Sequence, residues 1–171
     1  SNYVKLQDAN RDVERLLNNR RNNKLFTHMV GYICKLEHGQ QKGLHFHFIL
    51  FFDGAKVRRD EYIADQIGKY WRDVIAPMRG AYYTSNRHKK EMMSGLYGKF
   101  TALGIGMVHH ADTEAIANLF YVISYLCKVD QFLKMKESSK AKTLRMGQAP
   151  KKRNRRAGRP RSTSHLNFEM K

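Results

Sequence analysis

Two histidines separated by one residue stand inside an apolar segment, at a spacing that suits metal binding. His45 and His47 belong to the run from Gly43 to Phe52. Successive side chains of an extended strand point to opposite faces, so both imidazoles face one way while Phe46 faces the other. Imidazole nitrogens in apolar surroundings need hydrogen bonds or a metal ion. The spacing therefore predicts a strand that presents two nitrogen ligands to one ion.

A second group of reactive side chains lies in a helix predicted from Thr113 to Met135. Tyr121, Tyr125 and Lys128 are spaced by four and three residues, which places them along one helical face. That face carries two potential nucleophiles and a cation. Because the pKa of a phenol is about 10, either tyrosine needs help to act as a nucleophile at neutral pH.

Taken in this order, the two groups resemble the motifs of a known enzyme superfamily. The segment from His45 to His47 resembles the histidine-hydrophobic-histidine motif of the HUH endonucleases. The segment from Tyr121 to Lys128 resembles the two-tyrosine motif of their replication initiators, and inovirus-type and prophage replication proteins are the most similar. The resemblance covers residues 26–134. It implies site-specific nicking and rejoining of single-stranded DNA, which starts rolling-circle replication of a phage, prophage or satellite element.

The resemblance implies a metal site with three protein ligands. His45 and His47 supply two of them, and Glu37 is the expected third because it ends the neighbouring strand of a predicted hairpin. The alternative third ligands are His38, His109 and His110. The expected cofactor is Mn²⁺ or Mg²⁺; nitrogen ligands favour Mn²⁺, or Zn²⁺ by affinity alone.

The resemblance also gives the tyrosine helix its expected roles. Tyr125 precedes Lys128 by three residues and is the expected first nucleophile, leaving a 5′-phosphotyrosine and a 3′-hydroxyl that a polymerase can extend. Tyr121 would attack the second junction, and Lys128 would hold the phosphate as a cation. Two phenols in one site allow two linked transesterifications.

Each motif also has an ordinary structural explanation, and other functions fit the same residues. A histidine pair on a strand can be structural, and Tyr121 and Tyr125 could be core aromatic residues beside Phe120. An HUH relaxase or transposase would share the metal chemistry, although the second tyrosine argues against the small single-tyrosine transposases. A non-catalytic DNA-binding repressor or replication accessory protein is the third alternative.

Charge and length indicate one domain that binds a polyanion. The chain has 171 residues, 42% of them hydrophobic, and a formal net charge of +17. We expect single-stranded origin DNA, including a hairpin origin, as the partner, in the cytoplasm of a bacterial host and without membrane association. No glycine-rich phosphate loop is present, so a host helicase and polymerase are expected to assist. Two cysteines agree with a reducing compartment.

The expected DNA contacts lie in loops and in a C-terminal tail. We predict an endonuclease domain over residues 1–136 and a basic, disordered tail over residues 137–171, because residues 134–161 contain twelve basic residues and a single acidic one. The predicted contacts in loops are Arg58, Arg59, Arg87, Lys89 and Lys90. The predicted contacts in the tail are Lys151, Lys152, Arg153, Arg155, Arg156, Arg159 and Arg161.

The remaining elements predict an α+β fold with a central antiparallel sheet flanked by helices, as in HUH endonucleases. Helices are expected at residues 7–19 and 60–75, the second capped by Asp60, with a buried stripe that includes Tyr62 and Val74. A basic turn at residues 20–24 separates the first helix from a strand at 25–37. That strand pairs with the histidine strand, and further strands are expected at residues 81–83 and 104–110.

Overall fold

The computed structural model describes residues 4–39, 43–93, 104–127 and 142–147. Its elements in chain order are α1 (Leu6–Asn19), the 3₁₀ turn η1 (Lys24–Phe26), β1 (Met29–Gly39), β2 (Gly43–Phe52), α2 (Asp60–Tyr70), the π-helical η2 (Trp71–Ile75), the 3₁₀ turn η3 (Ser85–His88), α3 (Lys89–Met93), α4 (Thr113–Cys127) and β3 (Leu144–Met146). The α+β class and the antiparallel sheet are confirmed.

The sheet has the order β2-β1-β3 within the described residues, and both pairs are antiparallel. β1 and β2 form the predicted hairpin, in a register that places Glu37 directly opposite His45. β3 pairs with the other edge of β1, where Ile33 lies opposite Met146. Residues 144–146 were predicted to belong to a disordered tail, so that part of the prediction is corrected: the segment completes the sheet.

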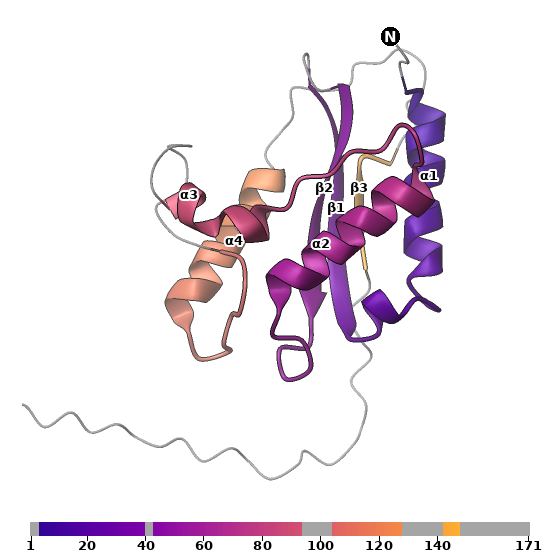
Figure 1. Ribbon diagram of the computed structural model, residues 1–171. Helices are drawn as coiled ribbons and strands as arrows, with labels where there is room; N and C mark the ends of the chain where they lie inside the picture. The colour runs from indigo at the N-terminus through magenta and orange to yellow at the C-terminus, as the bar shows by residue number, and fades with distance from the viewer. Residues whose placement is uncertain (1–3, 40–42, 94–103, 128–141, 148–171) are drawn as a thin grey trace, which may run out of the picture.

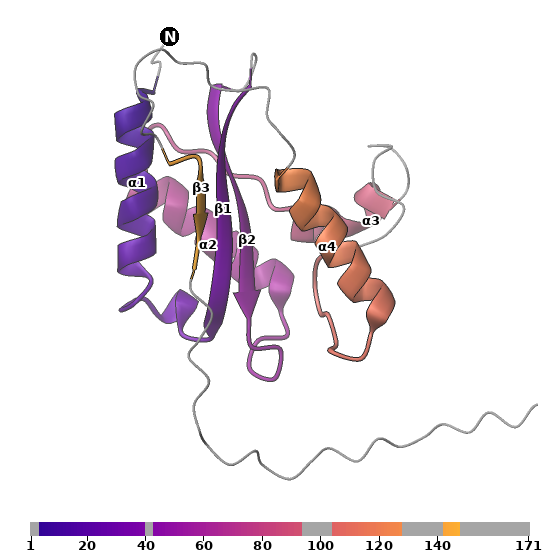
Figure 2. The same cartoon turned by 180° about the vertical axis from the view of Figure 1, so that it is seen from behind.

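One face of the sheet is covered by helices and forms the core. Alternate β2 side chains, including Phe48 and Leu50, pack against a buried cluster of Leu16, Phe26, Ile67 and Ile75. The ring of Trp71 contacts Phe48 at a centroid distance of 6.4 Å. In Figure 1, α2 crosses in front of the sheet, and in Figure 2 it lies behind it. Because strand residues alternate, His45 and His47 lie on the face of the sheet that α2 does not cover.

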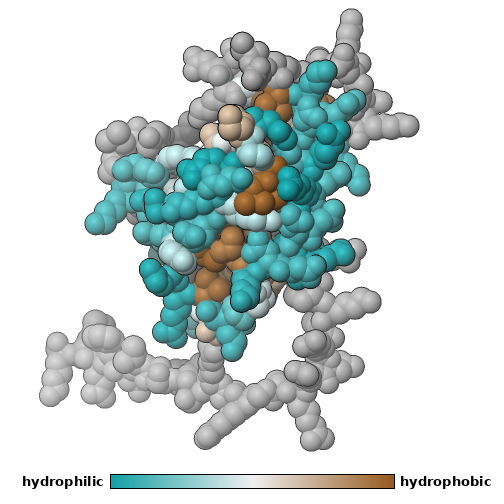
Figure 3. All heavy atoms as spheres, turned by 45° about the vertical axis from the view of Figure 1, so that its right-hand side comes forward, coloured by the Kyte–Doolittle hydropathy of each residue, from teal (hydrophilic) through white to brown (hydrophobic). Residues whose placement is uncertain are grey.

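The helices stand at different edges of this layer. Both views place α1 on the β3 side of the sheet and α4 on the β2 side. α1 is amphipathic and buries Ala9, Val13 and Leu16. Figure 3 brings the α1 side forward, where the surface is mainly hydrophilic with separate apolar patches.

Two predicted strands, at residues 81–83 and 104–110, are absent because side-chain contacts hold these segments without a strand partner. The hydroxyl of Tyr82 donates a hydrogen bond to Asp65 at 3.0 Å, and its ring lies against Gly68. In the second segment Gly104 lies so close to the Asn118 backbone of α4 that a side chain would collide with it. Gly106 has φ +103°, outside the range of an ordinary strand.

The first strand begins later than predicted, because local hydrogen bonds turn the chain at η1. The side chain of Asn23 accepts a hydrogen bond from the Leu25 amide, and the hydroxyl of Thr27 donates to the Lys24 carbonyl. The chain therefore enters β1 only at Met29. Such capping by asparagine is a turn signal that competes with the apolar residues around it.

The helix predicted at residues 60–75 is present, but its cap and part of its stripe were wrong. Arg59 occupies the N-cap position, and the carboxylate of Asp60 accepts hydrogen bonds from Asn86 and Lys89 instead. Tyr62 and Val74 are exposed, while Ile67 and Ile75 are buried. The π-helical end of this helix shifts the angular position of later residues, so a regular 3.6-residue period misplaces Val74.

Leu36 tests how strongly the covered face of the sheet holds the fold. Its side chain is fully buried, opposite Phe46 on β2. We expect Leu36→Ala to lower the free energy of unfolding by about 2–5 kcal/mol, because the substitution leaves a cavity that the sheet cannot close. Urea denaturation measures the change. Val30→Ala on the same strand, where the side chain is exposed, serves as the control and should change stability by less than about 1 kcal/mol.

Cys34 lies in the core of the fold. Cys34 is a buried free cysteine, and burial raises the pKa of its thiol to about 12. Its side chain is therefore a neutral part of the core at neutral pH.

Among the described residues, no helix is both long and apolar enough to cross a membrane.

Candidate metal centre

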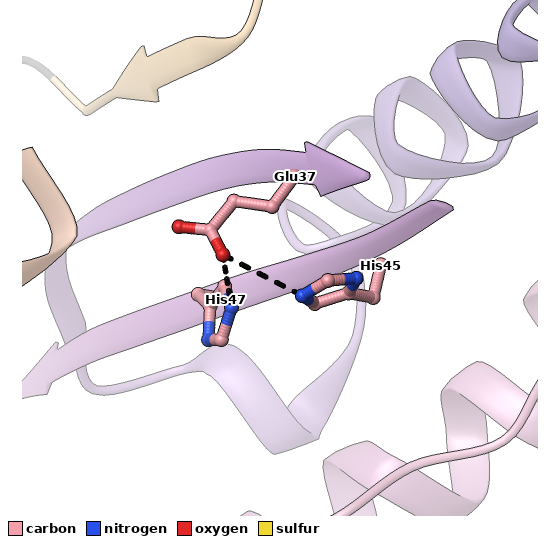
Figure 4. Close-up of side chains that lie close together, drawn as sticks. All are labelled: Glu37, His45 and His47. Atoms are coloured by element: carbon pink, nitrogen blue, oxygen red, sulfur yellow. Dashed lines mark hydrogen bonds and ion pairs between the residues drawn. The ribbon is translucent and has the colours of Figure 1, made fainter. Parts of the chain in front are cut away.

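Three side chains converge on the face of the hairpin opposite α2. Glu37 Oε2 lies 3.0 Å from His47 Nε2 and 3.5 Å from His45 Nε2 (Figure 4). One ligand atom from each residue lies within 4.8 Å of the other two. All three side chains are partly exposed. The predicted third ligand and the predicted histidine pair are thus brought together.

The hairpin positions each of these side chains. Glu37 and His45 are cross-strand partners, whose Cβ atoms lie about 5 Å apart on one face of an antiparallel pair. His47 is two residues further along β2 and therefore on the same face. Gly43, at φ +64°, begins β2 in a backbone conformation that other residues rarely adopt.

A backbone contact fixes the orientation of His45. Its Nδ1 donates a hydrogen bond of 3.0 Å to the Gly43 carbonyl oxygen, which can only accept. In a neutral imidazole the other nitrogen then carries a lone pair, and in His45 that nitrogen is the Nε2 beside Glu37. Carbonyl contacts of this kind orient histidine ligands in metal sites.

Two of the three separations between ligand atoms are compatible with a shared divalent ion. Ligand atoms about 2.1 Å from one ion lie about 3.0 Å apart at adjacent octahedral positions and about 3.4 Å apart at tetrahedral ones. The two separations from Glu37 Oε2 to the histidine nitrogens, 3.0 and 3.5 Å, match these values. Two imidazoles and a carboxylate are also a donor set suited to Mn²⁺ or Zn²⁺.

The alternative third ligands do not join this group. His38 precedes Gly39 on β1 and, as the neighbour of Glu37, points to the other face. His109 and His110 contact each other at a ring distance of 4.2 Å in a turn before α4, where His109 Nδ1 accepts a hydrogen bond from the Ala111 amide. Within the described residues, the only cluster with metal-ligand geometry is Glu37, His45 and His47.

The predicted helical face with two tyrosines is present on α4. Tyr121 is 50% exposed and Tyr125 is 39% exposed, so neither side chain is buried in the core. Ser124 lies on the same exposed side, whereas Leu126 is buried. Lys128, the predicted cation of this motif, lies outside the described residues.

Lys35 is a cation near the metal ligands that the sequence analysis missed. It lies directly opposite His47 on the neighbouring strand and is 6% exposed. Cross-strand partners share a face, so the lysine belongs to the face that carries the three ligands. The signal was available in the sequence, because Lys35 precedes Glu37 by two residues on the same strand.

Comparison with protein families places the chain. The family model described as YagK/YfjJ C-terminal domain matches residues 3–143. The chain belongs to this family. No curated protein and no solved structure matches it. The YagK/YfjJ match contains the three candidate metal ligands and the tyrosine pair, and ends immediately before β3.

Two of the predicted DNA-contacting cations of this YagK/YfjJ domain form ion pairs that hold the fold. Arg87 lies 3.1 Å from Asp65, and Lys89 lies 2.6 Å from Asp60. These carboxylates anchor the segment after α2, so the two cations are poorer candidates for phosphate than their sequence suggested. The guanidinium of Arg59 stacks on the Tyr62 ring at 4.7 Å.

The other predicted DNA contacts are either exposed or outside the described residues. Arg58 and Lys90 are exposed. The predicted contacts in the tail, Lys151, Lys152, Arg153, Arg155, Arg156, Arg159 and Arg161, lie outside the described residues.

Asp65 supplies a test of this ionic anchor through pH. Its side chain is buried, and hydrogen bonding from Lys69, with that from Tyr82 and the charge of Arg87, lowers its pKa below the usual 3.8. Stabilisation by a carboxylate with a lowered pKa is complete above 3.8 and is lost as pH falls through the lower folded value. We expect Asp65→Asn to be less stable than the original chain at pH 7, with a difference that shrinks below pH 3.8.

Urea denaturation at a series of pH values from 7 down to about 2.5 measures this difference. Other carboxylates with lowered pKa values, Asp60 and Asp73, are present in both proteins and cancel in the comparison. A difference that stayed constant over the whole range would show that Asp65 acts through shape rather than charge.

Proposed function

We propose that this protein is a metal-dependent endonuclease that nicks and rejoins single-stranded DNA through a tyrosine nucleophile, as initiators of rolling-circle replication do. The convergence of Glu37, His45 and His47 on one face of the hairpin carries the proposal. Partly exposed phenols on α4 and the net charge of +17 support it.

The metal site supplies the electrophilic half of the reaction. A divalent ion held by the three ligands would stabilise negative charge on the scissile phosphate. Glu37 also neutralises charge at the site, and the Gly43 carbonyl keeps His45 in the orientation that directs Nε2 inward. These contacts hold the ligands before DNA arrives, which reduces the cost of ordering them.

The tyrosine helix supplies the nucleophile. The Tyr125 phenol oxygen attacks phosphorus, the bond from phosphorus to the 3′ oxygen breaks, and the leaving oxygen takes up a proton as the phenol loses one. The product is a 5′-phosphotyrosine with a free 3′-hydroxyl. Attack by Tyr121, about 6 Å further along the helix axis, would transfer the second junction. The phosphodiester energy is retained because no water enters either step.

Formation of a covalent adduct tests the proposal. The full chain is incubated with labelled single-stranded DNA from the replication origin of a candidate element, with Mn²⁺ or with EDTA, and analysed on a denaturing gel. We expect a slower band that requires Mn²⁺ and disappears on protease digestion. No adduct with any candidate origin would favour a non-catalytic DNA-binding protein, in which the hydrogen bond of 3.0 Å between His47 and Glu37 is purely structural.

A further inference from the structure

The turn between α1 and β1 carries three cations that the proposed nicking reaction does not use. Arg20, Arg21 and Lys24, here called the basic turn, line an open cavity of about 510 Å³. Asn22 and Asn23 line the same cavity and a second one beside it. No acidic residue lines either cavity within the described part of the chain.

Ion pairing distinguishes the basic turn from other cations of the fold. Arg79 lies 2.7 Å from the buried carboxylate of Asp12, and Lys89 lies 2.6 Å from Asp60. Across the described ranges, none of the three cations of the basic turn has a carboxylate within salt-bridge distance. Their charge is therefore available to a ligand.

The charge of the helix end does not cancel these cations. The C-terminus of α1, at Asn19, carries the equivalent of roughly half a negative charge, far less than three guanidinium and ammonium groups. One of the cations is also held in place: the Arg20 guanidinium stacks on the Tyr32 ring at 4.8 Å. The side chains of Arg21 and Lys24 are exposed around the cavity.

We propose that the basic turn binds the phosphodiester backbone of DNA at a point remote from the nicking site. The turn adjoins Met29 at the start of β1, whereas Glu37 lies near its other end. At about 3.3 Å per residue, the two places are about 26 Å apart along β1, the axial length of roughly seven or eight base pairs of duplex DNA. The assignment of DNA as the ligand rests on the proposed function.

The course of the chain supports a polyanion at this place. Gly147, the last described residue, lines the same cavity as the basic turn, and its amide donates a hydrogen bond to the Tyr32 carbonyl. The sequence that follows contains seven cations between Lys151 and Arg161. The cations of the turn thus lie beside Gly147, which precedes the most basic segment of the sequence by four residues. A second contact at this distance would hold the strand in register while its phosphate is cleaved.

Salt-dependent DNA binding tests the proposal without catalysis. The full chain and two charge-matched variants are compared, Arg21→Gln with Lys24→Gln and Lys5→Gln with Arg11→Gln. The second pair removes two exposed cations from the other end of α1 and its first turns. Fluorescence anisotropy with a labelled DNA of about 30 nucleotides, single-stranded or duplex, is recorded in EDTA over a range of salt concentrations.

We expect the variant with Arg21→Gln and Lys24→Gln to bind the labelled DNA at least about tenfold more weakly near 0.1 M salt. The slope of log affinity against log salt should fall by about 1.8 on duplex DNA or about 1.4 on single strands, and the form that shows the change identifies the strand type at the turn. The control pair should change the slope by less than half as much. Equal changes in both variants, or none in the turn variant, would overturn the proposal.

Thermal melting of both variants separates a loss of binding from a loss of stability. A turn variant that binds weakly supports the proposal only if it melts within a few degrees of the original chain. EDTA removes the nicking reaction from this assay. If the original chain formed no adduct with DNA, the proposed function would be refuted but the binding result would stand. If the turn variant bound DNA as the original chain does, the proposed nicking function would still stand.

Discussion

Replacing Tyr125 with phenylalanine is expected to abolish the covalent adduct with single-stranded origin DNA. The substitution removes only the phenol oxygen that would attack phosphorus, and the side chain is already 39% exposed on α4, so packing should change little. Loss of a nucleophile lowers the rate by at least about 10³-fold. Single-turnover adduct formation in Mn²⁺, followed on a denaturing gel, measures the effect.

Two comparisons separate this chemistry from a general effect of losing a hydroxyl. Tyr62→Phe is the matched control, because Tyr62 is as exposed as Tyr121 and its ring contact with Arg59 survives the change. Tyr121→Phe should still form the first adduct but fail to transfer the second junction. If Tyr121→Phe lost the adduct and Tyr125→Phe kept it, the order of attack would be reversed.

The candidate metal site could be predicted because two simple regularities place it. Alternation along a strand puts His45 and His47 on one face, and a short hairpin places the end of β1 beside the start of β2. These two regularities are enough to predict from the sequence that Glu37 lies near the histidine pair. Lys35 obeys the same alternation, but a lysine in an apolar strand attracts less attention than a histidine.

Elements that depend on distant contacts could not be predicted in this way. The strand at residues 144–146 has only three residues, including the cation Arg145, and is too short to show an alternating pattern. It forms because it pairs with the edge of β1 at Ile33. Conversely, residues 104–110 contain enough apolar residues to suggest a strand. Gly104 instead packs on α4, and φ at Gly106 interrupts an extended backbone.

Ion pairs explain why some cations that the sequence analysis predicted to contact DNA are less available to a ligand, and why it did not predict others that are available. Arg87 and Lys89 stand in a basic cluster in the sequence, yet carboxylates 22 or more residues earlier hold both of them in the fold. Arg21 and Lys24 form an inconspicuous turn, and within the described chain no carboxylate pairs with them. Which charges remain for a ligand is decided by tertiary contacts, which composition does not record.

Removing one candidate metal ligand is expected to have the other large effect. Because Glu37 Oε2 lies between both imidazoles, at 3.0 and 3.5 Å from their nitrogens, Glu37→Gln would take the only negative charge from the ligand set. We expect Mn²⁺ affinity to fall by about 100-fold or more and adduct formation to be lost with it. Isothermal titration calorimetry of the DNA-free protein measures the affinity directly.

His38→Gln is the matched control, because His38 neighbours Glu37 on β1 but faces the opposite side of the sheet. It should bind Mn²⁺ as the original chain does. His47→Ala should behave like Glu37→Gln, since it removes a nitrogen ligand from the same cluster. If the original chain bound no Mn²⁺, or if Glu37→Gln and His38→Gln bound it equally, the three side chains would be a hydrogen-bonded structural group, and the adduct would require another source of electrophilic assistance.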